Sequence, residues 1–270
     1  MTRLFRMGGG EVTAALPGGP ASRQADFASA SMRAVVTTLE QIARTDLPLV
    51  ITGERGSGKE WAARFVHHRS ARGTMPFAVL DCGMADHREM ERAIYGVESM
   101  SWAGVNVVPG LLEETAGGTL LLDEALRLPA PLVMRLARVV EYGNARRFGA
   151  RGDYPVSTRL VATLTAAADE AEAAVRAEPW QRISPVVVEM PPLRSRREDV
   201  PVYVGIFLEE MRKRFSSSLS AVAPEAMELL TEASWPGNVR GLKNVLEHAA
   251  IVSDGELLLP EHLPDSVRKV

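Results

Sequence analysis

The strongest indication of the fold is the stretch Gly53-Glu54-Arg55-Gly56-Ser57-Gly58-Lys59-Glu60. It fits the pattern G-x-x-x-x-G-K and lies between a short apolar run at 47–52 and a segment with helical spacing at 60–71. A strand before the loop and a helix after it are the context that a phosphate-binding loop requires, and they disfavour the alternative of a glycine-rich turn ahead of a surface helix. We therefore predict that these eight residues bind nucleotide phosphates and that Lys59 reaches the β and γ phosphates.

A second motif, Asp123-Glu124, ends the apolar run Leu120-Leu121-Leu122. In open α/β sheets, ligands bind at the carboxyl edge, which is where these two carboxylates are expected. Asp123 is predicted to hold Mg²⁺, and Glu124 to polarise an attacking water. Two solvated acids at a strand end are the alternative, which the upstream phosphate loop disfavours. Glu60 stands where Ser or Thr normally contacts Mg²⁺, so the metal must be held elsewhere.

The order of elements predicts an α/β fold with a parallel five-stranded sheet between helices, followed by a small all-helical lid. Residues 83–96 read as a helix and lead into a loop that ends at Pro109-Gly110, while residues 166–178 are helical by propensity. We predict a flexible tail at 1–27, a nucleotide-binding domain at 28–197 and a helical lid domain at 198–270. The strands are expected at 47–52, 76–82, 117–124, 158–165 and 183–190.

Composition limits the function classes. The formal net charge is −3, which does not favour binding DNA by bulk electrostatics. The basic run of Arg146, Arg147, Arg151 and Arg159 is interpreted as a solvated loop rather than a DNA-binding patch. Cys82 is the one cysteine, so no internal disulfide can form. No apolar run reaches the roughly 18 residues of a membrane span, and the N-terminus lacks the apolar core of a signal peptide, so we expect a cytoplasmic protein.

The motifs together resemble a known family. GERGSGKE at 53–60, GGTLLLDEA at 117–125, PPLRSRREDVP at 191–201 and WPGNVRGL at 235–242 are similar to the central AAA+ domain of sigma-54-dependent transcription activators. The resemblance covers about residues 28–264 and accounts for Glu60, which is the usual residue of that family. It implies ATP with Mg²⁺ as ligands, a ring oligomer of hexameric size, and ATP hydrolysis coupled to remodelling of a transcription complex.

Several residue roles come only from this resemblance. Arg240 matches the sensor arginine of the lid, on a helix that Asn238 is expected to cap. Arg176 and Arg182 match two arginines that reach across the ring to the neighbour's ATP, where a guanidinium offsets developing charge. Arg182 is the stronger candidate, because an ordinary surface role is a serious alternative for Arg176.

The chain departs from the family pattern in ways that bear on function. In the loop at 99–108, which in the family touches sigma-54, Trp102 replaces the aromatic residue and Ala103 replaces the threonine. The candidate partners of this loop are therefore sigma-54 and another transcription component. Thr165 stands at the sensor position that normally holds Asn, and its single hydroxyl predicts weaker positioning of water. No DNA-reading helix-turn-helix and no regulatory domain are recognisable in the sequence.

Three functions remain to be distinguished. The leading one is an active ATPase that remodels a transcription complex. The second is a nucleotide-binding regulatory or adaptor module with impaired hydrolysis, which does not contact sigma-54. A P-loop kinase of a small molecule ranks last, because the lid and the Pro-rich segment have no role in such an enzyme.

Overall fold

The computed structural model describes residues 5–7, 27–83, 86–102, 104–166, 173–215, 219–253 and 255–268. Two compact units are found. The sheet unit combines the strand at 5–7 with Leu39–Thr52 and Ala62–Glu189, and the lid unit combines residues 27–38 with Gly53–Trp61 and Met190–Val270. The phosphate loop therefore clusters with the lid, although the strand that precedes it belongs to the sheet unit.

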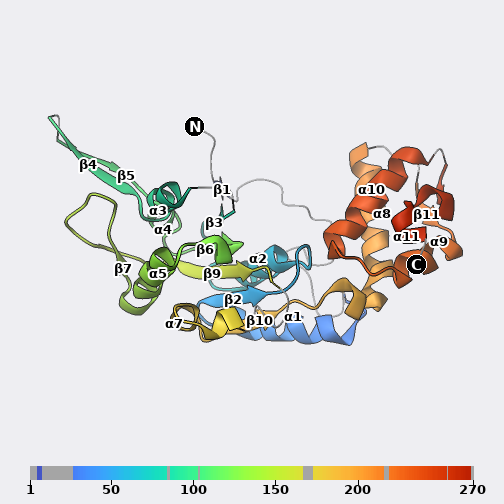
Figure 1. Ribbon diagram of the computed structural model, residues 1–270, viewed down its shortest axis with the longest axis horizontal. Coiled ribbons are helices and arrows are strands. Elements are labelled where there is room, and N and C mark those ends of the chain that lie inside the picture. The colour runs from blue at the N-terminus through green and yellow to red at the C-terminus, as the bar shows by residue number, and fades with distance from the viewer. Residues whose placement is uncertain are drawn as a thin grey trace. The chain divides into compact units, whose positions relative to one another are not determined.

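The sheet unit contains the predicted parallel sheet. Its parallel strands run in the order β3-β6-β9-β2-β10, and an added edge strand, β1, pairs antiparallel with β3 (Figure 1). The five predicted strands are confirmed, whereas β1 falls in the segment predicted as a tail. Most of that segment, residues 8–26, lies outside the described residues. The bounds are β1 Phe5–Met7, β2 Leu49–Thr52, β3 Phe77–Asp81, β6 Thr119–Asp123, β9 Arg159–Leu164 and β10 Val187–Glu189.

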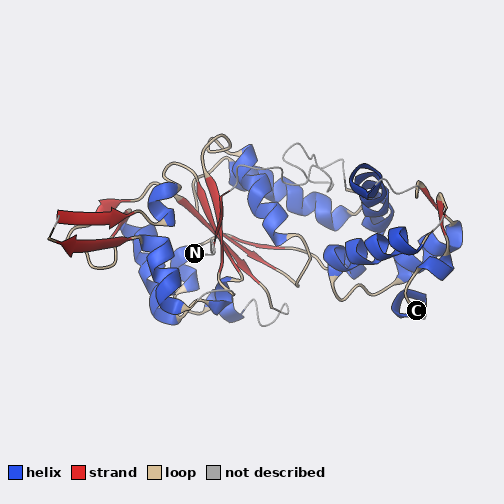
Figure 2. Ribbon diagram, turned by 90° about the horizontal axis from the view of Figure 1, so that it is seen from above, coloured by secondary structure: helices blue, strands red, loops and turns tan. Residues whose placement is uncertain are grey.

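Burial explains why these runs form central strands. Every residue of β2 and β9 is buried, as are the first four residues of β3 and of β6. Strands covered on both faces read as continuous apolar runs, as the sequence does here. The helices that flank the sheet are visible on both of its sides in Figure 2. They are α1 Ala30–Ala43, α2 Lys59–Arg69, α3 His87–Tyr95, α4 Leu111–Glu114, α5 Ala130–Tyr142 and α7 Trp180–Ile183.

The stretch expected as a loop at 99–108 belongs to a hairpin, so the loop expectation is corrected. Strands β4 Val97–Ser101 and β5 Gly104–Val108 pair antiparallel, with Met100 opposite Val105, and form a projecting ribbon (Figure 1). Alternating Val residues and a Gly at the turn carried a strand signal that the loop interpretation overlooked. Trp102 at its tip is fully exposed, and Met100 and Val105 are also exposed. Ala103 lies outside the described residues, as do 167–172 of the helix expected at 166–178, of which 173–176 are helical.

The lid unit is helical, as predicted. Its main helices are α8 Val200–Phe215, α9 Pro224–Glu232 and α10 Asn238–Val252. A small parallel pair, β11 Ala221–Val222 with β12 Leu257–Leu258, joins the loops between them and was not predicted. The chain ends in α11 Asp265–Arg268. None of the described helices is long and apolar enough to cross a membrane.

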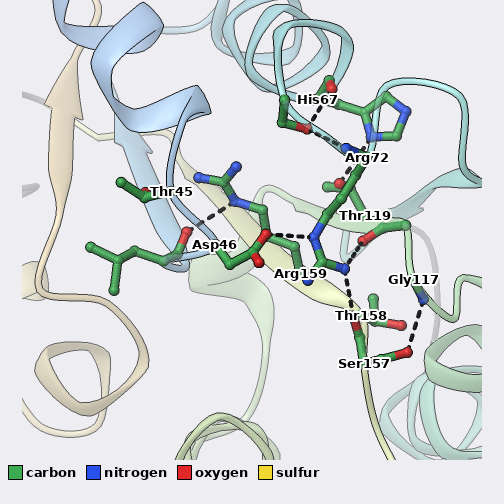
Figure 3. A network of polar contacts seen from close by, with 12 residues as sticks. Thr45, Asp46, His67, Arg72, Gly117, Thr119, Ser157, Thr158 and Arg159 are labelled. Carbon is green, nitrogen blue, oxygen red and sulfur yellow. Dashed lines mark hydrogen bonds and ion pairs between the residues drawn. The ribbon is translucent and has the colours of Figure 1, made fainter.

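Two arginines fix the amino ends of the central strands. Arg72 donates to the carbonyl oxygens of Ser157 and Gly118 and to the Asp46 carboxylate, at 2.6, 3.2 and 2.8 Å (Figure 3). Arg159, almost fully buried, donates to the carbonyls of Leu47 and Ile42 at 2.9 and 3.2 Å. These bonds tie the loops at the amino edge to β6 and β9. The acidic pair lies at the opposite, carboxyl edge of the sheet, away from this network.

A buried histidine beside this network gives a pH-dependent stability. His67 on α2 is 2% exposed, and its Nδ1 lies 2.9 Å from the Thr119 hydroxyl (Figure 3). Burial first, and then the neighbouring His68, lower the pKa of His67 to about 4. The folded protein therefore binds this proton less readily than the unfolded chain, whose His pKa is about 6.5. The contribution of the neutral His67 ring to the free energy of unfolding is therefore fully present above about pH 6.5. It is lost as the pH falls from there toward 4, because the unfolded chain then binds the proton first.

We expect His67→Asn to remove this part of the acid sensitivity. In the wild type, His67 adds a slope of up to about 1.4 kcal/mol per pH unit to the free energy of unfolding in that window. Denaturant unfolding between pH 7 and 4 measures the slope in the wild type, in His67→Asn and in the exposed control His87→Asn. The control His87→Asn is expected to show the same dependence of the free energy of unfolding on pH as the wild type. The prediction would be contradicted if the free energy of unfolding of the wild type and of His67→Asn depended on pH equally and only weakly.

Candidate nucleotide-binding site

The phosphate loop has the backbone shape that its glycines predict. Gly53, Gly56 and Gly58 have φ values of 140°, 76° and 107°, a region that side chains other than glycine rarely adopt. A Cβ on Gly53 would lie 2.8 Å from the Met190 carbonyl oxygen, and one on Gly56 would lie 2.3 Å from that of Gly237. The loop therefore needs glycine both for its curvature and for its close approach to neighbouring backbone.

Lys59 occupies the inside of this loop. It is the first residue of α2 and is only 7% exposed, and its ammonium donates to the Gly53 and Glu54 carbonyl oxygens at 2.9 Å each. Ser57 is buried as well, and its Oγ has no hydrogen-bond partner among the residues described. A buried cation and a buried hydroxyl thus belong to the glycine-rich loop and its first helical residue. Arg55 and Glu60 lie at its exposed margin.

Asn238 joins the loop to the lid and does not cap α10 as expected. Gly237 is the N-cap residue, with no side-chain cap bond, and Asn238 itself has a left-handed φ of 51°. Its amide nitrogen donates to the Arg55 carbonyl at 3.0 Å and to the Glu54 carboxylate at 3.1 Å, while its Oδ1 accepts from Leu193 N–H at 2.7 Å. Because the side chain is committed to these three partners, it cannot also cap the helix.

Two arginines of the Pro-rich segment strengthen this junction. Arg194 forms a double hydrogen bond with the Glu54 carboxylate, at 2.6 and 2.8 Å, which lowers the pKa of Glu54. Arg196 is fully buried and donates to the Ser57 carbonyl at 2.7 Å. The Pro-rich segment at 191–201 therefore contacts the loop at two points, the Glu54 side chain and the Ser57 carbonyl. Its own backbone forms two 3₁₀ turns, Leu193–Ser195 and Arg197–Asp199.

Arg240 lies next to the loop within the lid unit. It sits in the first turn of α10, is exposed, and its Cβ is 3.1 Å from the position a Cβ on Gly56 would take. The Val239 N–H donates to the Gly56 carbonyl at 3.1 Å. The structure thus brings together the predicted phosphate loop, Lys59 and the predicted sensor arginine.

The acidic pair lies at the carboxyl end of β6 in the sheet unit, as predicted. Asp123 is its last residue, and Glu124 follows with left-handed backbone angles of φ 53° and ψ 43°. Both are held by Thr163 of β9, whose hydroxyl donates to Asp123 Oδ1 at 2.5 Å and accepts from Glu124 N–H at 3.0 Å. Sequence reasoning missed Thr163. Its signal was a hydroxyl inside an apolar central strand, because a buried polar group requires a partner.

A third carboxylate lies beside the pair. Asp81 ends β3 in register with Asp123. A Cβ on Gly83 would lie 3.2 Å from an Asp81 oxygen and 3.4 Å from a Glu124 oxygen, which puts both acids next to that glycine. Burial, then the negative charge of Asp123, raises the pKa of the intervening Cys82 thiol. Cys82 is therefore a protonated core residue and not a nucleophile.

The remaining predicted residues lie elsewhere in the sheet unit. Thr165 directly follows β9 and is half-buried. Arg182 on α7 forms a double hydrogen bond with Glu141 of α5, 2.8 Å on each arm. Arg176 is exposed on the helical turn at 173–176.

The basic run does not gather into a patch. Arg146 pairs with Asp153, Arg147 pairs with Glu113 and Glu98, and Arg159 is buried at the amino edge of the sheet. These pairs neutralise two of the arginines within the chain itself. The solvated-loop interpretation therefore holds for Arg146 and the exposed Arg151, whereas it is wrong for Arg159, whose guanidinium is buried among backbone carbonyls.

The residues fit a triphosphate with its metal. The glycine cradle, the buried Lys59 ammonium and the unpartnered Ser57 hydroxyl suit phosphate oxygens. Within the described parts of the chain, no three His, Cys, Asp or Glu side chains gather as a metal cage. Mg²⁺ bound through one or two carboxylates plus substrate phosphates does not require a cage, and Asp123 supplies such a carboxylate.

Fold and site define the class of protein. A parallel sheet in the order found, a glycine-cradled lysine after one strand, an Asp-Glu pair after another and a helical lid are the architecture of an AAA+ P-loop protein. Comparison with known proteins then gives the family. A model of the sigma-54 interaction domain matches residues 26–189, and a model of the AAA+ ATPase lid domain matches residues 194–270. The chain belongs to the sigma-54 interaction domain family.

Relatives of known name agree with this assignment. The transcriptional regulatory protein ZraR of Klebsiella oxytoca is 34% identical over 239 residues, which is 87% of this chain and 54% of that protein. The anaerobic nitric oxide reductase transcription regulator NorR of Aliivibrio fischeri is 35% identical over 243 residues, or 87% of this chain and 48% of that protein. The chain thus spans about half the length of these relatives.

Solved structures support the fold in the same way. NtrX from Brucella abortus in complex with ATP has a TM-score of 0.79 at 30% identity, covering 90% of this chain and 54% of that one. Its ADP complex also has a TM-score of 0.79, at 29% identity, covering 90% and 55%. The two-part fold described here is therefore that of a nucleotide-bound relative.

Proposed function

We propose that this chain binds ATP with Mg²⁺ and hydrolyses it in a ring oligomer, in order to remodel a transcription complex. The observation that carries the proposal is the phosphate loop, in which three glycines with positive φ surround a buried lysine. The named complexes of NtrX with ATP and with ADP support the choice of nucleotide. The division into a nucleotide-binding domain at 28–197 and a lid at 198–270 is part of the same proposal.

The proposed site joins the two described clusters on one nucleotide. The loop follows β2 directly, and the acidic pair ends β6, which is separated from β2 in the sheet only by β9. Carboxyl ends of parallel strands share one edge, where ligands of such sheets bind. Lys59 and Arg240 are proposed to bind the phosphates of the nucleotide on which Asp123 and Glu124 act.

Each residue has a distinct proposed task. Lys59 neutralises the β and γ phosphates and keeps them in place. Asp123 holds the metal, whose positive charge, when it is bound, would offset the negative charge on the phosphate oxygens as the phosphoryl group is transferred to water. Glu124 orients a water toward the γ phosphorus and accepts its proton. Glu54, Arg55, Gly56, Ser57, Gly58 and Glu60 complete the loop, and Thr165 and Arg240 contact the γ-phosphate side.

Partner contacts form the outer layer of the proposal. Arg182, and less strongly Arg176, would reach the nucleotide of the adjoining subunit. The hairpin β4–β5 would contact sigma-54 or another transcription component through Trp102, whose side chain is fully exposed. An exposed tryptophan with Met100 and Val105 behind it is a surface that a partner can bury.

Glu124→Gln tests the hydrolytic part. We expect turnover to fall about 100-fold, because a positioned general base contributes on the order of 10²–10⁴. ATP affinity should stay near the wild-type value, since the amide keeps the shape and the loop is untouched. Phosphate release and equilibrium ATP binding, measured on the same sample, separate the two effects. The exposed Glu228→Gln on α9 is the control and should behave as the wild type.

The same experiment decides between the two nucleotide-binding functions. If the wild type hydrolyses ATP and Glu124→Gln does not, the ATPase function is supported. Tight ATP binding with equal, negligible turnover in the wild type and in Glu124→Gln would overturn it in favour of a regulatory or adaptor module.

A further inference from the structure

Thr163 is a polar residue placed where an apolar one would complete the core. It lies inside β9, in register with Ile51 of β2, and its side chain is fully buried. Its neighbour Ala162 is in register with Leu122 of β6, directly before the acidic pair. The hydroxyl therefore points to the end of β6 from within the sheet.

The Thr163 hydroxyl donates one hydrogen bond and accepts another, and the two partners belong to the two residues of the acidic pair. A hydroxyl has one proton, and here that proton goes to Asp123 Oδ1 at 2.5 Å. One lone pair accepts the Glu124 N–H at 3.0 Å. With its donor committed, the hydroxyl fixes Asp123 by its side chain and Glu124 by its backbone at the same time.

The backbone of Glu124 needs such support. Among the described residues, only Glu124, Trp235 and Asn238 combine a side chain with a positive φ. Left-handed angles in a residue other than glycine persist only where the surroundings hold them. The Thr163 bond to Glu124 N–H is a contact that holds this conformation, and the conformation sets the direction in which the Glu124 side chain leaves the strand.

We propose that Thr163 is a positioning residue for the hydrolytic carboxylates. It orients Asp123 for the metal and Glu124 for the water, without itself touching the nucleotide. The inference rests on the proposed ATPase function and deepens it. It assigns part of the task expected of Thr165, which directly follows the same strand, to a side chain that the structure joins to both acids.

Removal of the hydroxyl should impair chemistry more than binding. In Thr163→Val the shape is kept, but a half-buried Asp123 oxygen loses its donor and the Glu124 N–H loses its acceptor. Partners of metal-binding groups typically account for about 10–100-fold in metal affinity or activity. We expect turnover to fall by about that factor and the Mg²⁺ concentration for half-maximal turnover to rise about tenfold, with little change in the affinity for ATP measured without metal.

Matched variants separate positioning from a merely structural role. Thr163→Ser restores the hydroxyl and should recover turnover to within about threefold of wild type. Thr158→Val is the control, because Thr158 precedes the same strand at its amino edge and its hydroxyl lies 2.9 Å from both the Leu112 and the Thr115 carbonyl oxygen, away from the acidic pair. It should leave turnover and Mg²⁺ dependence unchanged even if the melting temperature falls.

A double-mutant cycle completes the test. If Thr163 acts through Asp123, adding Thr163→Val to Asp123→Asn should cost much less than it does in the wild type, whereas a structural effect would be additive. The inference is overturned if Thr163→Val keeps wild-type turnover and Mg²⁺ dependence, or if Thr163→Ser fails to recover what Thr163→Val loses. If Thr163→Val does not fold, Thr163→Ala and Thr163→Ser give the same comparison. A wild-type protein without turnover refutes the proposed function, and the Mg²⁺ dependence of ATP affinity then still tests Thr163.

Discussion

Lys59→Ala is expected to abolish productive ATP binding. The wild-type ammonium is buried in the loop and already donates to two carbonyl oxygens, so it is held where phosphate oxygens arrive. A hydrogen bond to a charged group contributes about 1.5–3 kcal/mol, which corresponds to a loss of ATP affinity of roughly 10–100-fold. Loss of a preorganised donor lowers turnover by a further factor of about 10²–10³. Together, kcat/KM should fall on the order of 10⁴-fold.

The control for this variant is Lys213→Ala. Lys213 is a mostly exposed lysine of α8 that pairs with Glu209 one turn earlier. Its loss should leave ATP binding and phosphate release as in the wild type. Isothermal titration with ATP and a phosphate-release assay measure both variants. Hydrolysis that survives Lys59→Ala at more than a few per cent would show that this loop does not hold the substrate.

Arg182→Ala is expected to lower turnover per subunit by about 10³-fold while ATP affinity changes little. An arginine supplied across an interface typically contributes 10³–10⁵ to phosphoryl transfer. The double hydrogen bond to Glu141 holds Nε and Nη2, which keeps the guanidinium in a fixed orientation on α7. Arg176→Ala is expected to have a smaller effect, because Arg176 has the weaker claim to this role.

Subunit mixing tests whether Arg182 acts on the neighbour. A subunit with Arg182→Ala keeps its own loop, and a subunit with Lys59→Ala keeps its own Arg182. At a mixed interface, the intact halves combine into one complete site, so two inactive proteins should regain measurable turnover when combined. No recovery at concentrations where the mixture forms rings would contradict a site shared between subunits.

Much of the fold was predictable because its signals are local. The apolar runs before Gly53 and Asp123 are buried strands, and the helical spacing after residue 200 became α8, α9 and α10. The glycines of the loop have the positive φ values that phosphate binding requires. In these segments, local propensity, burial and motif all indicate the same structure, so a short window of sequence is enough to predict it.

The errors concern residues whose role depends on distant partners. Asn238 follows a glycine at a helix start, where a cap is the local expectation, yet it binds Glu54, Arg55 and Leu193 instead. The prediction of a loop at 99–108 is wrong because the flanking residues pair with each other as the hairpin β4–β5. Thr163 lacks a motif of its own, and its role is visible only once β9 is placed beside β6. Sequence spacing does not record such neighbours.

The roles of Lys59, Asp123, Glu124 and the arginines all depend on one event, the uptake of ATP by the phosphate loop. Equilibrium titration of the pure protein with ATP, with and without Mg²⁺, measures that event directly. We predict saturable binding with a dissociation constant well below about 1 mM, tighter with Mg²⁺ and weakened roughly 10–100-fold in Lys59→Ala. A folded protein that takes up no adenine nucleotide at millimolar concentration would contradict the role proposed for the phosphate loop.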